Sequence, residues 1–373
     1  MKKTASLSVL IPFVVFIALL FVLRLCLPSR TFSERENRNL QQRPAFSFSA
    51  LFSGDYTKRF ETYITDQFPF RDSWTTLKAR CELLTGKREN NGVYYCGNDV
   101  LISRFDEPSA SELLDKVDSV NALTDHVSVP VYFALIPGAA EVQSELLPEN
   151  APCGSQRAVI DAAYAASRAR NVDMLSALDT HDGEYIFYRT DHHWTSLGAF
   201  YGYNALRAAW DLSPADIGAY EPVTVSTEFY GTTYSSSGFS WVAPDAIETF
   251  VPDDGSVVIT NFNTGAPETT PLYDESFLSV KDKYAYFLGG NTPRLHIDTG
   301  SAGKPRLCII RDSYTDSLVP FLLADFSEID ILDLRYYKES VSGYITDGDY
   351  DMVLVIYSAA NFSTDTNLFM LET

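Results

Sequence analysis

Apolar residues fill residues 7–23 almost without interruption, with Pro12 as the only break. This run is close to the ~20 residues that a membrane-spanning helix needs and is longer than the ~7 to 15 apolar residues of a usual signal peptide. Lys2 and Lys3 before it favour a cytoplasmic N-terminus, and no small-residue cleavage site follows it. The pattern predicts an uncleaved signal anchor over residues 1–28, which places the rest of the chain outside the cytoplasm. A cleaved signal peptide is the alternative.

Residues 29–108 alternate between polar stretches and short amphipathic patterns. We expect a stalk up to about Phe48, then two short amphipathic helices between Ser49 and Leu84 with a break at Pro69. The turn residues Asn90, Asn91 and Gly92 and two short apolar runs then indicate a hairpin. The predicted hairpin strands are Val93–Tyr95 and Val100–Ile102.

From residue 109 the chain alternates between amphipathic helices and short, almost fully apolar strands. Such strands are typical of a parallel sheet whose two faces are both covered. We expect an α/β domain formed by 109–211 and 304–373, interrupted by a β-rich insertion over 212–303. The predicted helices are Ser111–His126, Val159–Arg170, Ser196–Trp210 and Leu318–Phe326, and the predicted strands are Val127–Ile136, Val172–Leu178, Arg306–Ile310, Ile329–Leu334 and Tyr350–Tyr357.

Composition limits the classes of function that remain. The 373 residues are 46% hydrophobic, which is enough for one large core or two modest ones. The formal net charge of -20 argues against binding to nucleic acid or to an anionic lipid surface, since both need a basic face. The five cysteines show no metal-binding spacing. Cys81 and Cys96 could form a disulfide in an oxidising compartment or remain separate thiols, and Cys308 in an apolar strand is expected to be a buried thiol.

The segment Tyr188–Trp194 places two of the chain's five histidines beside an aspartate. In an extended or turn segment, residues two apart project to the same side, so Asp191 can orient one ring nitrogen of His193 while the other faces a site. His192 would then point away. A metal site formed by Asp191, His192 and His193 is a further possibility, but adjacent histidines are a poor chelating pair and no further ligand completes a shell.

An acid–base pair of this kind needs a nucleophile, and Ser313 is the candidate. It follows the apolar strand Arg306–Ile310 and precedes a predicted helix. A serine at such a junction lies at the carboxyl edge of the sheet, where N–H groups of the following helix can stabilise an oxyanion. The alternative is that Asp312 or Ser313 only caps that helix.

These motifs resemble those of a known family. The segment Thr190–Thr195, with Gly198 and Ala199 after it, is similar to the signature of the DHHW protein family, and Asp312–Tyr314 is similar to its nucleophile motif. Two upstream segments, Ser33–Leu40 and Glu89–Tyr94, also resemble that family. The first two motifs further resemble the SGNH-hydrolase-like alginate O-acetyltransferases.

The resemblance implies an α/β fold with an SGNH-hydrolase-like parallel sheet, flanking helices and a circularly permuted motif order, in which Asp and His precede Ser. It implies a triad of Asp191, His193 and Ser313, and it places Asn361 near an oxyanion hole. Arg311 stands where such motifs usually carry glycine.

Two cations accompany the nucleophile motif. Arg311, and Arg335 with Tyr336 at the end of the next strand, are candidates for contacting an anionic donor or acceptor. Ordinary salt-bridged or solvated side chains are the alternative.

The resemblance also implies a function: an extracytoplasmic, membrane-anchored O-acetyltransferase that modifies a cell-surface polysaccharide and needs neither cofactor nor metal. Because no acyl-CoA pool exists outside the cytoplasm, this function requires a membrane-bound O-acyltransferase partner that supplies acyl groups. A carbohydrate esterase with the same triad and a catalytically silent glycan-binding or scaffold protein are the alternatives. Four aromatic residues of the insertion could line a glycan groove or pack in the core: Tyr230, Tyr234, Phe239 and Trp241.

Overall fold

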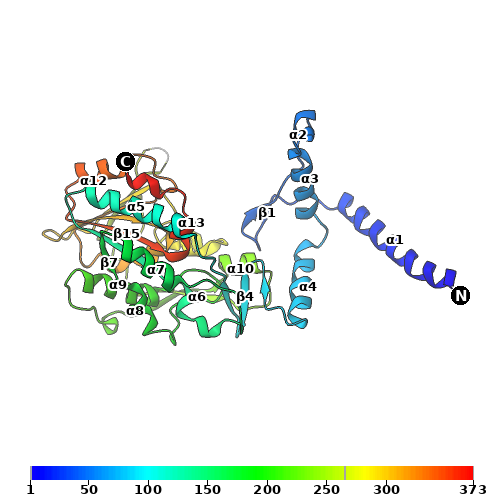
Figure 1. Cartoon of the computed structure of the whole chain (residues 1–373), viewed down its shortest axis with the longest axis horizontal. Helices are drawn as coiled ribbons and strands as arrows, with labels where there is room; N and C mark the ends of the chain where they lie inside the picture. The colour runs from blue at the N-terminus through cyan, green and yellow to red at the C-terminus, as the bar shows by residue number, and fades with distance from the viewer. Residues whose placement is uncertain (1, 264–265, 373) are drawn as a thin grey trace. The chain divides into compact units, whose positions relative to one another are not determined.

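The computed structural model describes residues 2–263 and 266–372, and the chain folds as two compact units (Figure 1). The first unit contains Met1–Lys87 and Gly238–Ser240, and the second contains Arg88–Ser237 and Trp241–Thr373. The first unit therefore ends at Lys87. The reason is that the hairpin segment packs into the second unit, where the N–H of Leu101 donates to the carbonyl of Arg189 at 2.8 Å.

The first unit is mainly helical. The long apolar helix α1 includes a stretch, Ser8–Cys26, that is long and apolar enough to cross a membrane. The amphipathic pattern of the next segment gives two helices on either side of Pro69, as the sequence predicts, preceded by one short helix. The elements are α1 (Lys2–Cys26), β1 (Phe32–Ser33), β2 (Arg38–Asn39), α2 (Phe48–Phe52), α3 (Asp55–Asp66) and α4 (Arg71–Leu84).

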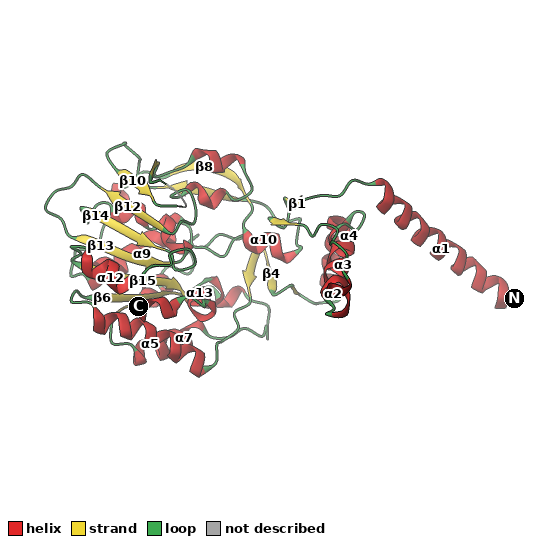
Figure 2. Ribbon diagram, turned by 90° about the horizontal axis from the view of Figure 1, so that it is seen from above, coloured by secondary structure: helices red, strands yellow, loops and turns green. Residues whose placement is uncertain are grey.

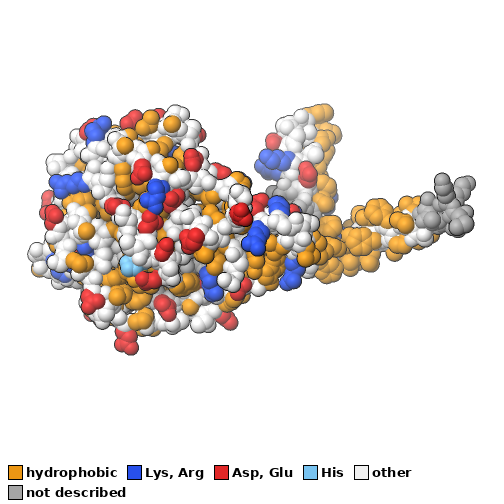
Figure 3. Space-filling model, turned by 60° about the horizontal axis from the view of Figure 1, so that its bottom comes forward, with side chains coloured by type: hydrophobic (Ala, Val, Ile, Leu, Met, Phe, Trp, Pro, Cys, Tyr) orange, Lys and Arg blue, Asp and Glu red, His pale blue; other side chains and the backbone are white. Residues whose placement is uncertain are grey.

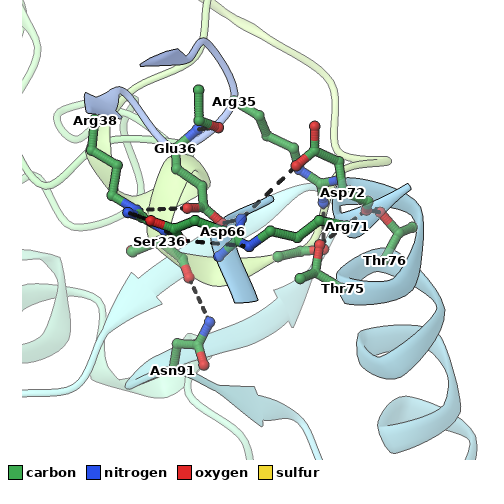
Figure 4. Close-up of polar contacts among 12 residues, drawn as sticks. Arg35, Glu36, Arg38, Asp66, Arg71, Asp72, Thr75, Thr76, Asn91 and Ser236 are labelled. Carbon is green, nitrogen blue, oxygen red and sulfur yellow. Dashed lines mark hydrogen bonds and ion pairs between the residues drawn. The ribbon is translucent and has the colours of Figure 1, made fainter. Parts of the chain in front are cut away.

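An ionic network centred on the buried Asp66 ties the arm after α1 to the helices (Figure 4). Arg38 donates two hydrogen bonds to this carboxylate, at 3.0 and 2.6 Å, and the N–H of Gln41 donates a third at 2.8 Å. Glu36 accepts from both Arg38 and Arg71. Burial works to raise the pKa of Asp66, but the bonds from Arg38 hold it below its usual value. The Ser33–Leu40 motif thus has a structural role within this unit.

The second unit is built on one mixed sheet of eight strands, ordered β11-β10-β12-β14-β13-β15-β6-β7. Strands β14, β13, β15, β6 and β7 are parallel, whereas β12, β10 and β11 extend the β14 edge in antiparallel fashion. Figure 2 shows these strands side by side. Their bounds are β6 (Val131–Ile136), β7 (Arg170–Val172), β10 (Val258–Asn261), β11 (Glu268–Thr270), β12 (Arg294–Asp298), β13 (Arg306–Arg311), β14 (Glu328–Leu332) and β15 (Met352–Ser358).

Helices cover both faces of this sheet, as apolar parallel strands require. Side chains alternate between the faces, so Val353 and Val355 of β15 enter one core while Leu354 and Ile356 enter the other. The first core also holds residues of α5 (Ala110–His126), α7 (Gln156–Ala166), α12 (Val341–Asp347), α13 (Ala359–Thr364) and η6 (Leu368–Glu372), and the second holds residues of α8 (Met174–Asp179), α9 (Ser196–Ala209) and α11 (Val319–Leu322).

The remaining elements of this unit are short. Two small sheets are formed by β3 (Glu89–Asn90), β4 (Val93–Gly97) and β5 (Val100–Ser103), and by β8 (Val223–Phe229) and β9 (Asp245–Thr249). The short helices are α6 (Ala139–Val142), η1 (Ser144–Leu146), η2 (Ile217–Ala219), α10 (Thr232–Ser237), η3 (Glu275–Ser279), η4 (Lys283–Tyr286) and η5 (Ser313–Ser317).

One predicted strand is wrong. Val172 ends β7, and the stretch up to Leu178 belongs to helix α8. The side chain of Asp173 accepts from the N–H of Ser176 and caps this helix. The apolar residues after the cap therefore follow helical rather than strand periodicity.

The β-rich character of 212–303 is present, but much of the segment is part of the main sheet. Strand β12 pairs with β14 over five residue pairs, and β10 pairs with β12 over four. These strands are short and contain both polar and apolar residues. From the sequence alone, such a pattern predicts a separate β-rich segment rather than strands of the main sheet.

All five cysteines, each within the described residues, are free thiols. Cys308 lies fully buried in β13, as expected from its apolar strand. Cys81 and Cys96 fall in different compact units.

His296 on β12 provides a test of how the sheet edge depends on pH. Its Nδ1 lies 3.2 Å from both carboxylate oxygens of Asp330, which raises the pKa of His296 above its usual value. The pair therefore stabilises the fold fully below the unfolded pKa of about 6.5, and this stabilisation is lost as pH rises through the higher folded pKa. We expect His296→Gln to lower the melting temperature at pH 5.5 by the equivalent of about 1 kcal/mol or less. The difference from wild type should shrink by pH 8.5, and a difference that grows with pH would contradict this assignment.

Candidate active site

The segment that carries Asp191 and His193 is a tight turn in the second unit. Phe187 pairs with Trp194 in an antiparallel bridge, and the N–H of Tyr188 donates to the carbonyl of His193 at 3.2 Å. The fully buried Asp245 accepts from the N–H and hydroxyl of Thr190 at 2.8 and 2.5 Å. The turn is thus fixed on both sides of Asp191.

Asp191 is buried, and both of its carboxylate oxygens face hydrogen-bond donors. Its Oδ1 accepts from the backbone N–H of His193 at 3.0 Å and lies 2.5 Å from Nδ1 of the same residue. Its Oδ2 accepts from the N–H and hydroxyl of Thr232 at 2.6 and 3.0 Å. Burial alone would raise the pKa of this carboxyl, but His192, His193 and these bonds hold it well below its usual range. Asp191 is therefore ionised.

His193 connects this carboxylate to the serine. Because its Nδ1 faces an ionised carboxylate, the proton of the neutral ring lies on Nδ1 and the Nε2 lone pair can accept a proton. Nε2 lies 2.8 Å from Oγ of Ser313. The ring also stacks on Tyr284, with centroids 3.8 Å apart and planes inclined by 9°. The imidazole is thus oriented by one hydrogen bond and one aromatic face.

Ser313 begins the short helix η5 directly after β13 and is only partly buried. The capping role that sequence considerations leave open belongs to Asp312, whose Oδ1 accepts from the N–H of Tyr314 at 3.0 Å. Its Oδ2 accepts from the N–H and hydroxyl of Ser358 at 2.8 Å each. Asp312 thus fastens the end of β13 to the end of β15 and leaves the Ser313 hydroxyl to His193.

His192 points to a different partner. Its Nδ1 lies 2.6 Å from Oγ1 of Thr232, and burial together with the adjacent His193 lowers the pKa of His192 to about 4. Potential ligand atoms of Asp191, His192 and His193 lie within 4.8 Å of one another, a spacing that would admit a cation. However, the bonds of Asp191 to His193 and Thr232 and of His193 to Ser313 already use the lone pairs that a cation would need.

The three candidate substrate-binding residues are paired with acidic residues at the same sheet edge. Asn361 donates to Oδ2 of Asp312 at 2.7 Å. Arg311 is fully buried beside Asp316, with the charged atoms 3.0 Å apart, and Arg335 makes bonds of 2.9 and 2.6 Å to Asp333.

Asn291 joins the two arginines. Its Oδ1 accepts from Arg311 at 3.3 Å and from Arg335 at 2.9 Å. Both arginines therefore form salt bridges, which is the alternative to contact with an anionic donor or acceptor. The burial of Arg311 was not predicted.

Several contributing residues were not foreseen. Gly231 packs against Asp191, and Thr232 donates to its carboxylate. Tyr284 stacks on His193, and Asp245 accepts hydrogen bonds from the turn. None of them belongs to a motif. A glycine after two aromatic residues and a tyrosine in a polar stretch carry no signal of proximity to a histidine up to about 90 positions away.

Gly231 offers a test of this packing. A Cβ at this position would lie 2.1 Å from Oδ2 of Asp191 and 2.2 Å from its Cβ. Gly231→Ala therefore forces the carboxylate away from His193, and a displacement of about 1 Å is expected to lower kcat/KM about 10²-fold. Steady-state hydrolysis of an activated acetyl ester measures this. Gly183→Ala, where a Cβ meets nothing within 4 Å, is the matched control, and equal activity of the two variants would contradict the prediction.

The four aromatic residues of the insertion lie in three different places. Phe239 is buried and belongs to the first unit, so it packs in a core as the alternative interpretation expects. Tyr230 and Tyr234 pack against each other with ring centroids 4.5 Å apart, beneath the ammonium group of Lys281. Trp241 packs on Tyr95. Tyr230 and Tyr234 are only partly buried, and contact with a sugar stays a prediction for them.

A mixed α/β sheet with a serine at the carboxyl end of one parallel strand and an Asp-x-His turn beside it is the arrangement that the resemblance to SGNH-hydrolase-like proteins implies. Comparison with protein families agrees, because the model of the DHHW protein family matches residues 92–332. The match spans more than half of the chain, and the chain belongs to the DHHW protein family.

Solved structures share the fold. A DHHW family protein from Eubacterium siraeum superposes with a TM-score of 0.65 at 25% identity, covering 76% of this chain and 95% of its own. PatB1 of Bacillus cereus superposes with a TM-score of 0.63 at 20% identity, covering 75% of this chain and all of its own.

Curated relatives match a shorter region. The probable alginate O-acetylase AlgJ of Pseudomonas aeruginosa is 27% identical over 175 residues, which is 43% of this chain and 44% of the relative. The corresponding protein of Pseudomonas syringae is 25% identical over 178 residues, or 44% and 46%. The chain thus spans less than half the length of the curated relatives it matches.

Proposed function

We propose that this protein is an extracytoplasmic, membrane-anchored O-acyltransferase that transfers an acetyl group to a hydroxyl of a cell-surface polysaccharide. The observation that carries the proposal is the chain of hydrogen bonds from Asp191 through His193 to Ser313, at 2.5 and 2.8 Å. The curated relatives named as probable alginate O-acetylases support acetyl as the transferred group. The apolar helix α1 supports the proposed membrane anchor.

In the first half-reaction, Oγ of Ser313 attacks the carbonyl carbon of the acyl donor while its proton moves to Nε2 of His193. Asp191 stabilises the imidazolium through Nδ1. The backbone N–H of Ser313 would stabilise the developing oxyanion, since the N–H groups of Tyr314 and Thr315 donate to Asp312. The tetrahedral intermediate collapses, the donor oxygen or sulfur leaves with the proton from His193, and acyl-Ser313 remains.

In the second half-reaction, a sugar hydroxyl attacks acyl-Ser313 and gives its proton to Nε2 of His193. When the new ester forms, the proton returns to Oγ of Ser313. Water in place of the sugar gives hydrolysis by the same steps. In this proposal Asn361, Arg311 and Arg335 shape the site edge through Asp312, Asp316 and Asp333 rather than by direct contact with the acyl group.

The acyl donor must come from a membrane partner. Outside the cytoplasm there is no pool of acyl-CoA, so a membrane-bound O-acyltransferase that exports acyl groups completes the reaction. Helix α1 would keep Ser313 near such a partner by confining the chain to the membrane surface.

The charge of the second unit indicates the type of acceptor. Residues 88–373 contain 42 Asp and Glu against 16 Lys and Arg. A surface of this sign repels a polyanion. The acceptor in this proposal is therefore a neutral glycan, in contrast to the alginate named for the curated relatives.

The test uses the purified full chain in detergent with p-nitrophenyl acetate as donor and either cellohexaose or an alginate hexasaccharide as acceptor. Acetylated cellohexaose in the mass spectrum, with little acetylated alginate, is the expected result. Release of p-nitrophenol without sugar acetylation would favour the esterase. No ester cleavage beyond that of the Ser313→Ala protein would favour the silent scaffold.

A further inference from the structure

The first unit exposes an unusual amount of apolar surface for its size. Phe52 and Leu84 are 86% and 88% exposed, and Phe48 and Phe70 are 71% and 60% exposed. Figure 3 shows hydrophobic side chains gathered along the helices of this unit. Apolar groups of this size and exposure indicate a contact surface for another molecule or for a membrane.

The apolar residues lie on one face of each helix. In α3 they are Tyr56, Phe60, Tyr63 and Ile64, at the i, i+4, i+7 and i+8 spacing of an amphipathic helix. In α4 they recur at i, i+3, i+7 and i+10: Trp74, Leu77, Cys81 and Leu84. We call these two stripes, together with the exposed Phe48, Phe52 and Phe70, the apolar face of the first unit.

Aromatic contacts join this face to the end of α1. The rings of Tyr56, Phe60 and Tyr63 pack in sequence with centroids 5.8 and 6.0 Å apart. The guanidinium of Arg24, in the last turn of α1, lies 5.0 Å from the centroid of the Tyr63 ring and donates to its hydroxyl. Because Arg24 closes the apolar stretch that can cross a membrane, Tyr63 lies at the level where that stretch would leave the bilayer. Aromatic residues are enriched at this level in membrane proteins.

The balance of basic and acidic residues also differs between the two units. Residues 27–87 contain ten Lys and Arg against seven Asp and Glu, whereas residues 88–373 contain 16 against 42. The acidic charge that argues against an anionic lipid surface for the chain as a whole thus belongs to the second unit, where 16 Lys and Arg against 42 Asp and Glu give a net charge of -26. The first unit is mildly basic, as anionic lipid surfaces require.

A groove lined by residues of α3, α4 and the loop between them combines apolar and basic side chains. It has a volume of about 350 Å³, and its lining combines Ile64, Phe68 and Trp74 with Arg71 and Lys78, which form ion pairs with Glu36 and Glu82. Apolar lining in a unit with excess basic charge matches a lipid that presents acyl chains below an anionic headgroup.

We propose that the apolar face of the first unit lies in the membrane interface, as a second contact with the bilayer beside α1. Amphipathic helices of this kind bury their apolar face about 5–10 Å into the boundary between headgroups and acyl chains. The second unit, which carries excess acidic charge, is then linked to a unit fixed on the surface rather than to a single flexible anchor.

Trp74 allows a direct test, since it is the only one of the four tryptophans in the first unit. The full chain is reconstituted into vesicles of phosphatidylglycerol and phosphatidylcholine with brominated acyl chains. We expect quenching of tryptophan fluorescence by bromines near the headgroup and by bromines further along the chain, because Trp74 also packs on Phe16 of α1, with ring centroids 6.3 Å apart. Trp74→Phe should remove most of the quenching.

A matched pair of variants separates lipid contact from mere anchoring, because α1 is intact in both. Phe52→Ser combined with Phe70→Ser should reduce the quenching of Trp74, whereas Phe369→Ser, 59% exposed in the second unit, should leave it unchanged. Unquenched Trp74 in these vesicles would overturn the proposal. It would assign the apolar face to a partner protein or to a second copy of the chain.

Discussion

Replacing Ser313 with alanine is expected to lower the rate of acyl transfer about 10⁴-fold or more, because it removes the atom that becomes acylated. The hydroxyl of Ser313 is paired with Nε2 of His193, whereas the surrounding turn is held by Asp312 through Tyr314 and Ser358. Loss of the hydroxyl should therefore leave the fold intact. The rate is measured with p-nitrophenyl acetate under single-turnover conditions, with intact-protein mass spectrometry to detect the acylated chain.

Two observations decide the result. Wild type should gain the mass of one acetyl group and Ser313→Ala should not. Ser111→Ala, an exposed serine on α5, is the control and should behave as wild type. An acylated Ser313→Ala protein would assign the nucleophile to another residue and contradict the triad.

Asp191→Asn should lower the rate by about 10⁴-fold with Ser313 still in place, a magnitude known from the serine protease triad. Both carboxylate oxygens of Asp191 accept from N–H donors, one from His193 and one from Thr232. An amide offers one oxygen, so its NH₂ must face one of these donors or Nδ1 of His193. Turned toward Nδ1, the NH₂ forces the ring proton onto Nε2, and Ser313 loses its base.

The same substitution should also reduce stability, which distinguishes it from Ser313→Ala. The NH₂ of the introduced amide would be buried against the N–H of Thr232 or His193, and an unsatisfied buried donor costs about 1–3 kcal/mol. Thermal unfolding measures this loss beside the kinetics. Asp349→Asn, at a fully exposed carboxylate, is the control. Activity of Asp191→Asn within tenfold of wild type would show that His193 is oriented without the carboxylate.

The candidate site residues that could be predicted from the sequence are those identified by a short motif or by an adjacent strand. Asp191 and His193 are two positions apart, and Ser313 directly follows an apolar strand, so spacing and strand pattern predict their places at the site. The alternation of helices and apolar strands likewise predicts the parallel half of the sheet, which the structure confirms.

The features that could not be predicted depend on contacts between distant segments. The packing of Gly231 on Asp191 and of Tyr284 on His193 arises only when the region after α9 folds over the turn. The antiparallel strands β10, β11 and β12 are too short and too polar to be assigned to the main sheet from their pattern. Burial of Arg311 was missed because a charged residue at a strand end is usually exposed.

The hydrogen bonds around Asp312 make the turn that carries Ser313 depend on a later part of the chain. Asp312 accepts from Ser358 and Asn361, which lie within the last sixteen residues of the chain. Because Ser358 and Asn361 follow Ser313 in the sequence, the Asp191 turn and Ser313 are synthesised before these donors. A chain truncated immediately before β15 would lose both these donors and the strand that pairs with β13 and β6, so it would lack the support of the Ser313 turn.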